Sequence, residues 1–118
     1  MKYVPLPRVA RAEVERIVAS GTDTEIGEAL IGAAMTSTER GWVEECAIRQ
    51  LHDGAPEARR CAALALGHLA RIHGAIAPEA VELLGALLDD PVTAGAAEDA
   101  LDDVAMFVTA GDVVPGSA

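Results

Sequence analysis

Apolar residues recur along this chain at intervals of three and four positions, which is the period of an α-helix with one buried face. Proline, glycine and short polar stretches interrupt this period at intervals that suit helix ends. Together they predict six helices, over residues 7–19, 23–35, 39–52, 57–73, 78–88 and 92 or 93 to 108. Because no segment reads convincingly as a strand, the expected fold class is all-α.

The breaks between these helices are short, and several carry residues that suit helix ends. Gly74 is expected to end the fourth helix. The residues expected to cap the helix starts are Asp23 or Thr24 for the second helix and Ser37 or Thr38 for the third. Loops this short make consecutive helices antiparallel neighbours.

The chain length and composition agree with one helical domain. Its 118 residues are typical of a single domain. We expect that domain over 1–110 and a frayed tail over 111–118. Aromatic residues make up only 3% of the chain, which disfavours a β-sandwich or a small barrel. Isolated glycines within the helices are interpreted as close-packing positions, namely Gly27, Gly32, Gly67, Gly85 and Gly95.

The third and fourth helices are repeated by the fifth and sixth. Segment 51–54 aligns with 88–91 at an offset of 37, and segment 62–66 aligns with 97–101 at an offset of 35. This pattern resembles HEAT-like repeats, with the best match over 51–67. The resemblance implies a short α-solenoid of about three antiparallel helical hairpins, an architecture that usually offers a binding face to a partner.

The negative charge is concentrated in the last part of the chain. The formal net charge is −10, which disfavours binding to nucleic acid or to an anionic membrane. Residues 72–118 contain no lysine or arginine and account for −9 of that total. This asymmetry is either a clue to a basic partner or a device for solubility, and the sequence leaves both interpretations open.

The sixth predicted helix places four carboxylates on one face. On a helical wheel Ala97, Leu101 and Val104 share the inward side. The outward side carries Glu98, Asp99, Asp102 and Asp103 around Met106. The pairs four residues apart repel each other by roughly 0.2–0.5 kcal/mol each, so we expect a partner to supply positive charge. The alternative is a solvent-exposed face whose electrostatic repulsion the fold tolerates.

Two segments carry a narrower resemblance. Residues 67–74 and 97–108 are similar to segments of small bacterial HEAT-type immunity proteins of contact-dependent inhibition or polymorphic toxin systems. That resemblance implies binding and neutralisation of a cognate toxin domain inside the producing cell. If the toxin is a nuclease, we expect it to be basic, because a nuclease needs a positively charged surface to hold nucleic acid. The alternative function is a general HEAT-like adaptor or scaffold without a toxin partner.

Two further residues are candidates for partner contact. His68 is expected near the groove side of the fourth helix. Trp42 lies off the apolar stripe of the third helix, so it is either a core residue or a partner-facing anchor.

No pattern of residues indicates catalysis. The chain has no nucleophile–base motif, glycine-rich phosphate loop or metal signature, so no enzyme activity, cofactor or metal is expected. The opening segment lacks the apolar core of a signal peptide, and no apolar run is long enough to span a membrane. Cys46 and Cys61 lack the spacing of a redox motif and are expected to be reduced, half-buried thiols. We therefore expect a cytoplasmic protein that is monomeric by itself.

Overall fold

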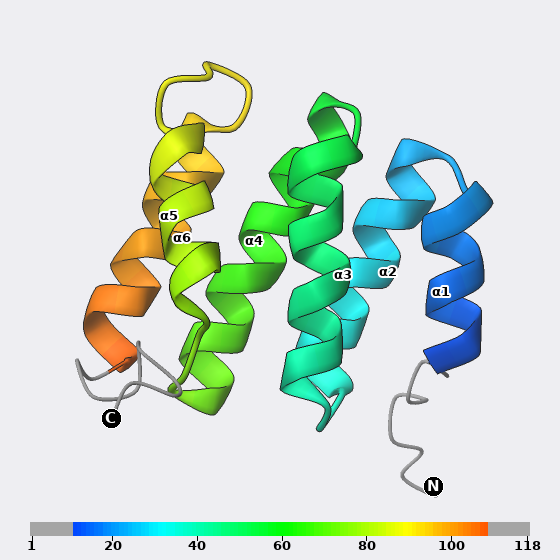
Figure 1. The fold of residues 1–118 in the computed structure, drawn as a ribbon, viewed down its shortest axis with the longest axis horizontal. Helices are drawn as coiled ribbons and strands as arrows, with labels where there is room; N and C mark the ends of the chain where they lie inside the picture. Colours follow the sequence, from blue (N-terminus) through cyan, green and yellow to red (C-terminus); the bar gives the residue numbers. More distant parts are fainter. Residues whose placement is uncertain (1–10, 109–118) are drawn as a thin grey trace, which may run out of the picture.

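Six α-helices make up most of residues 11–108, the part of the chain that the computed structural model describes (Figure 1). They are α1 (Arg11–Ser20), α2 (Asp23–Thr36), α3 (Arg40–Asp53), α4 (Pro56–His73), α5 (Pro78–Leu87) and α6 (Ala94–Phe107). The predicted all-α class is confirmed for these residues. The expected helix start at residue 7 and the expected tail over 111–118 lie outside the described residues.

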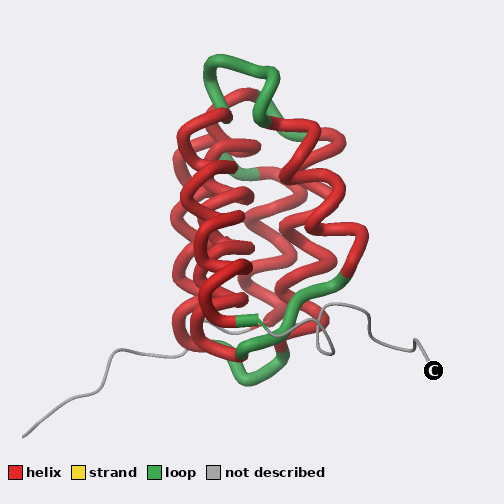
Figure 2. The backbone as a smooth tube through the Cα atoms, turned by 90° about the vertical axis from the view of Figure 1, so that its left-hand side faces the viewer, coloured by secondary structure: helices red, strands yellow, loops and turns green. Residues whose placement is uncertain are grey.

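The helices form two layers, as the end-on view shows (Figure 2). Helices α2, α4 and α6 pack side by side, with α4 in the middle in extensive contact with both neighbours (Figure 1). Helices α1, α3 and α5 lie over them, and α3 packs mainly on α4. The helices α1 and α6 therefore lie at opposite ends of a molecule that measures 43 Å along its longest axis.

Small residues let the helices of the first layer approach closely. A Cβ atom on Gly27 would lie 2.6 Å from Cys61 Sγ, so α2 meets α4 at a position that only glycine fits. A Cβ atom on Gly67 would lie 3.0 Å from the Cα atom of Ala100, which brings α4 against α6. The close-packing interpretation is thus confirmed at these two glycines. It is wrong for Gly85 and Gly95, where a Cβ atom would meet open space.

The helix ends differ from the expected caps at two places. The N-cap of α2 is Thr22, whose hydroxyl accepts from the Glu25 backbone N–H while the Glu25 carboxylate accepts from the Thr22 N–H. These hydrogen bonds hold the pKa of Glu25 below its usual value. The N-cap of α3 is Glu39, whose side chain makes no cap hydrogen bond, and Ser37 Oγ accepts the Glu39 N–H in the preceding turn. Gly74 ends α4 in the left-handed conformation, as predicted.

The core runs between the two layers and consists of leucine, valine, isoleucine and many alanines. The largest fully buried apolar side chains are Leu30, Leu66, Leu69, Ile76, Leu84, Val14 and Val43. Cys46 and Cys61 are free thiols, but they are buried and not half-buried as expected, because both face a neighbouring helix. Burial raises the pKa of each thiol and so disfavours the reactive thiolate.

A buried carboxylate ties the loop before α5 to α3. Glu44 is 6% exposed, and its Oε2 atom accepts hydrogen bonds from the Ala77 backbone N–H and from Arg40, both at 2.9 Å. The carboxylate therefore satisfies a backbone donor that has no helical partner at the start of α5.

Removing that carboxylate will destabilise the fold. We expect Glu44→Ala to lower the free energy of unfolding by about 1–3 kcal/mol, because it leaves the Ala77 N–H unsatisfied. The matched control is Glu45→Ala on the exposed side of the same helix, expected to change stability by less than about 0.5 kcal/mol. Urea unfolding followed by circular dichroism measures both; equal losses for the two variants would show that the Glu44 contact contributes nothing.

Candidate partner-binding site

The orientation of α6 follows from its apolar period. Ala97 and Ala100 are almost fully buried against the rest of the domain, and Val104 is 8% exposed. The carboxylates of Glu98, Asp99 and Asp102 consequently lie on the exposed side of the helix, as does Met106. We call this surface, with Asp103 at its edge, the acidic face of α6.

Asp103 and His68 lie on facing positions of α6 and α4. Asp103 is half-buried, and a Cβ atom on Gly67 would come within 3.2 Å of its Oδ2 atom. His68 is half-buried, and its Nδ1 atom is 2.8 Å from the Arg71 guanidinium. Burial and the adjacent Arg71 lower the pKa of His68, while the nearby Asp103 carboxylate opposes the shift. The structure therefore brings His68 to the edge of the acidic face as a predominantly neutral side chain at pH 7.

Arginines from the first part of the chain do not neutralise the acidic face. Within residues 11–108 the arginine ion pairs join Arg11 to Glu15 and Glu39, Arg40 to Glu44, Arg59 to Asp90, and Arg60 to Glu57. No ion pair in that part of the chain includes Glu98, Asp99, Asp102 or Asp103. The four carboxylates therefore have no ion-pair partner among the described residues, although the Arg71 guanidinium lies beside His68 at the edge of the face.

Two exposed apolar side chains lie at the end of α6, next to the carboxylates in the chain. Met106 is 76% exposed and Phe107 is 41% exposed. A charged face beside exposed apolar side chains has the chemical make-up of many protein interfaces.

The structure places Trp42 in the core. Its side chain is 8% exposed, its indole N–H donates to Glu15 Oε1 at 3.0 Å, and the Arg11 guanidinium lies 5.1 Å from its ring centre. Of the two roles that the sequence left open, the geometry fits packing between α1 and α3. Trp42 consequently offers little surface to a partner.

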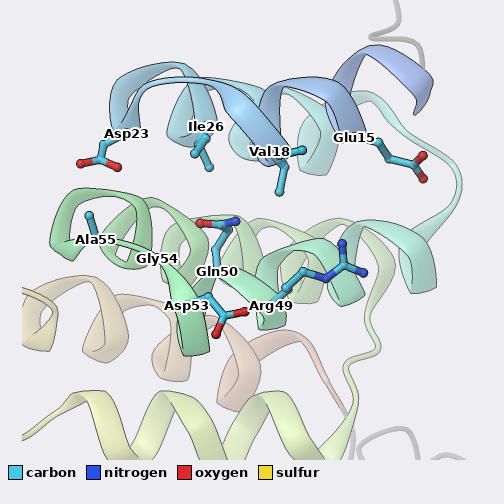
Figure 3. A pocket seen from close by; sticks show the side chains of 10 residues that line it. Glu15, Val18, Asp23, Ile26, Arg49, Gln50, Asp53, Gly54 and Ala55 are labelled. Atoms are coloured by element: carbon cyan, nitrogen blue, oxygen red, sulfur yellow. The ribbon is translucent and has the colours of Figure 1, made fainter.

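Sequence reasoning missed a groove between α1 and α3. The groove has a volume of about 450 Å³ and is lined from α1, from the start of α2, from α3, and from the turn between α3 and α4 (Figure 3). Its polar members include Arg49 and Gln50. No sequence signal pointed to it, because the helices that line it are separated in the chain and meet only through the tertiary fold.

The described residues contain no cluster of three or more side chains suited to hold a metal ion. Among the same residues, no helix has both the length and the apolar character needed to cross a membrane.

A comparison with solved structures gives an informative match. No protein-family model matches the chain, and no curated protein matches it. A chain in a solved structure, described as "Crystal structure of CDI complex from Cupriavidus taiwanensis LMG 19424", shares 30% sequence identity with it. The two structures superpose with a TM-score of 0.76, and the match covers 92% of this chain and 99% of that chain.

The described residues form a small all-helical protein with a strongly acidic face on α6. The similarity in sequence and structure to the chain of the CDI complex specifies the family. The chain belongs to the same family as this component of the CDI complex.

Proposed function

We propose that this chain is an immunity protein of a contact-dependent inhibition (CDI) system, which binds a cognate toxin domain and neutralises it. The observation that carries the proposal is the near full-length likeness, at 30% identity, to a chain of a CDI complex. The acidic composition and the absence of a catalytic motif in the sequence support a role in binding over one in catalysis.

The proposed contact surface is the acidic face of α6. Glu98, Asp99 and Asp102 are exposed and would pair with lysine or arginine side chains of the toxin. Asp103 and His68 would form the edge of the contact, and Met106 would supply apolar area. A toxin that acts on nucleic acid needs a basic surface to hold its substrate, so an acidic helix docked there would block substrate entry.

The proposal includes a repeat architecture and a cellular location. The two helical layers, with α2, α4 and α6 side by side, support a short HEAT-like solenoid. Neutralisation inside the producing cell implies a cytoplasmic protein that acts by occupying the toxin, without a cofactor.

Copurification with a toxin tests the proposal. The partner to use is the toxin domain encoded directly beside the gene for this chain, expressed as a catalytically inactive variant. We expect one stable complex on size-exclusion chromatography, with an affinity that falls at least about tenfold between about 0.05 and 0.5 M NaCl, since salt screens contacts between exposed charges. Failure to bind that domain, with capture of an unrelated enzyme instead, would favour the adaptor alternative and contradict the proposal.

A further inference from the structure

A cation borders the acidic face of α6. Arg71 lies in the last turn of α4, is exposed, and is the last lysine or arginine of the chain. One of its guanidinium nitrogens is 2.8 Å from His68 Nδ1, and His68 in turn lies close enough to Asp103 for that carboxylate to act on its pKa. A partner docked on α6 therefore meets a positive charge as well as the carboxylates.

The packing of α4 on α6 fixes the level of this cation along the face. Two glycines of α4 meet α6 at the same offset along the chain, so the two helices run in the same direction with a constant register. A Cβ atom on either would lie within 3.4 Å of a backbone atom of α6, from Gly67 to Ala100 and from Gly74 to Phe107. By this register Arg71 is level with Val104, next to Asp103.

Arg71 differs from the other arginines of α4 because it has no carboxylate partner. Arg59 and Arg60 each pair with a carboxylate. Arg71 forms no ion pair with another residue of 11–108, although the acidic face is adjacent. Its hydrogen bond goes to His68 instead, where Nδ1 is the acceptor because an arginine can only donate. A neutral imidazole orients the guanidinium without neutralising its charge.

An oriented guanidinium with unused N–H groups suits a carboxylate. The fork of an arginine matches the two oxygens of an aspartate or glutamate, and the resulting hydrogen bonds are charge-assisted. A uniformly basic partner would place a lysine or arginine against Arg71, and contacts between like charges reduce affinity. A surface that complements both α6 and Arg71 consequently combines basic residues with an acid.

We infer that the toxin surface that docks on α6 contains an aspartate or glutamate, surrounded by basic residues, that pairs with Arg71. This inference rests on the proposed function and refines the chemistry of the same contact. The pair fixes the register of the toxin along α6. It also disfavours basic proteins that lack an acid at this position, because they would leave Arg71 facing a cation.

A single substitution has opposite effects if the toxin contains this acid and if only the carboxylates of α6 attract it. Arg71→Gln makes the surface more negative, so attraction by the carboxylates alone would tighten binding. We expect it to weaken binding of the inactive toxin domain about fivefold in isothermal titration calorimetry, because the acid of the toxin loses its partner. Arg71→Lys, which keeps the charge, is expected to bind more tightly than Arg71→Gln.

The matched control removes an arginine from the opposite end of the molecule. Arg16 on α1 is exposed and likewise forms no ion pair with another described residue. Arg16→Gln changes the net charge by the same amount and is expected to change the Kd less than about twofold at physiological salt. A loss equal to that of Arg71→Gln would assign the effect to net charge and overturn the inference.

Substitutions in the toxin identify its acid. Each aspartate and glutamate of the inactive toxin domain is replaced by its amide in turn. One replacement is expected to weaken binding of the wild-type chain about fivefold and to leave binding of Arg71→Gln unchanged. If Arg71→Gln binds as tightly as the wild type or more tightly, or if no acid is coupled to it, the inference is wrong and the proposed function stands. If the wild-type chain does not bind the toxin domain, the proposed function itself is wrong.

Discussion

Neutralising the acidic face of α6 is expected to weaken toxin binding about 100-fold. The variant replaces four carboxylates together, as Glu98→Gln, Asp99→Asn, Asp102→Asn and Asp103→Asn. Each exposed ion pair contributes up to about 1 kcal/mol, and four such contacts at about 0.7 kcal/mol give the stated factor. Most of the loss should come from slower association at low salt, because exposed charges mainly steer the encounter.

The same variant is expected to gain stability. Glu98 and Asp102, and likewise Asp99 and Asp103, are like-charged pairs four residues apart, and each pair costs roughly 0.2–0.5 kcal/mol. Removing both repulsions should raise the free energy of unfolding by about 0.5–1 kcal/mol in urea. Affinity and stability thus change in opposite directions, which a simple folding defect does not produce.

A control variant with the same change in net charge separates the effect of the acidic face on affinity from the effect of the overall charge. Four exposed acids on other elements form no ion pair within the described residues, namely Glu13, Glu45, Glu82 and Asp89. Replacing these four by their amides is expected to change affinity by less than about threefold at physiological salt. If this control weakens binding as much as the α6 variant, or if the α6 variant binds normally, the site assignment is wrong.

The largest loss of stability is expected in the centre of α4. Leu66 is fully buried on the helix that contacts α2, α3 and α6. Truncation to alanine removes apolar contacts and leaves a cavity that the neighbouring helices cannot close, so Leu66→Ala should cost about 2–5 kcal/mol. Because a domain of this size is stable by only about 5–15 kcal/mol, thermal unfolding should move down by more than about 10 °C.

The control for this substitution is Leu88→Ala in the turn after α5. Leu88 is 41% exposed, so the same chemical change should cost less than about 1 kcal/mol there. Differential scanning calorimetry of both variants measures the contrast. Similar melting temperatures for the two would mean that α4 is not the central packing element.

The helices could be predicted from the sequence because their apolar period and their breaks are local signals. The residues at which the helices begin and end were predicted less accurately. Thr22, not Asp23, caps α2, because Thr22 and Glu25, three residues later, form a capping box. The openness around Gly85 and Gly95 could not be predicted either, since the space beside a glycine depends on which helix packs against it.

The candidate site likewise has features that the sequence predicts and features that it does not predict. The outward direction of Glu98 and Asp102 follows from the helical period alone, so the sequence predicted it correctly. The position of Asp103 against His68 depends on how α6 packs on α4, and the sequence contains no signal for that register. The burial of Trp42 depends on how α1 packs on α3, and the groove beside Gln50 is lined by residues that are far apart in the chain, so only the tertiary structure shows them.

The most direct measurement is a titration of active toxin with this chain, in which the toxin's residual activity is followed. Stoichiometric neutralisation predicts that activity falls linearly and reaches zero at about one equivalent of the chain, when the toxin concentration is well above the Kd. Loss of activity at a small fraction of an equivalent would indicate turnover and hence an enzyme. Full activity at several equivalents would contradict an immunity function altogether.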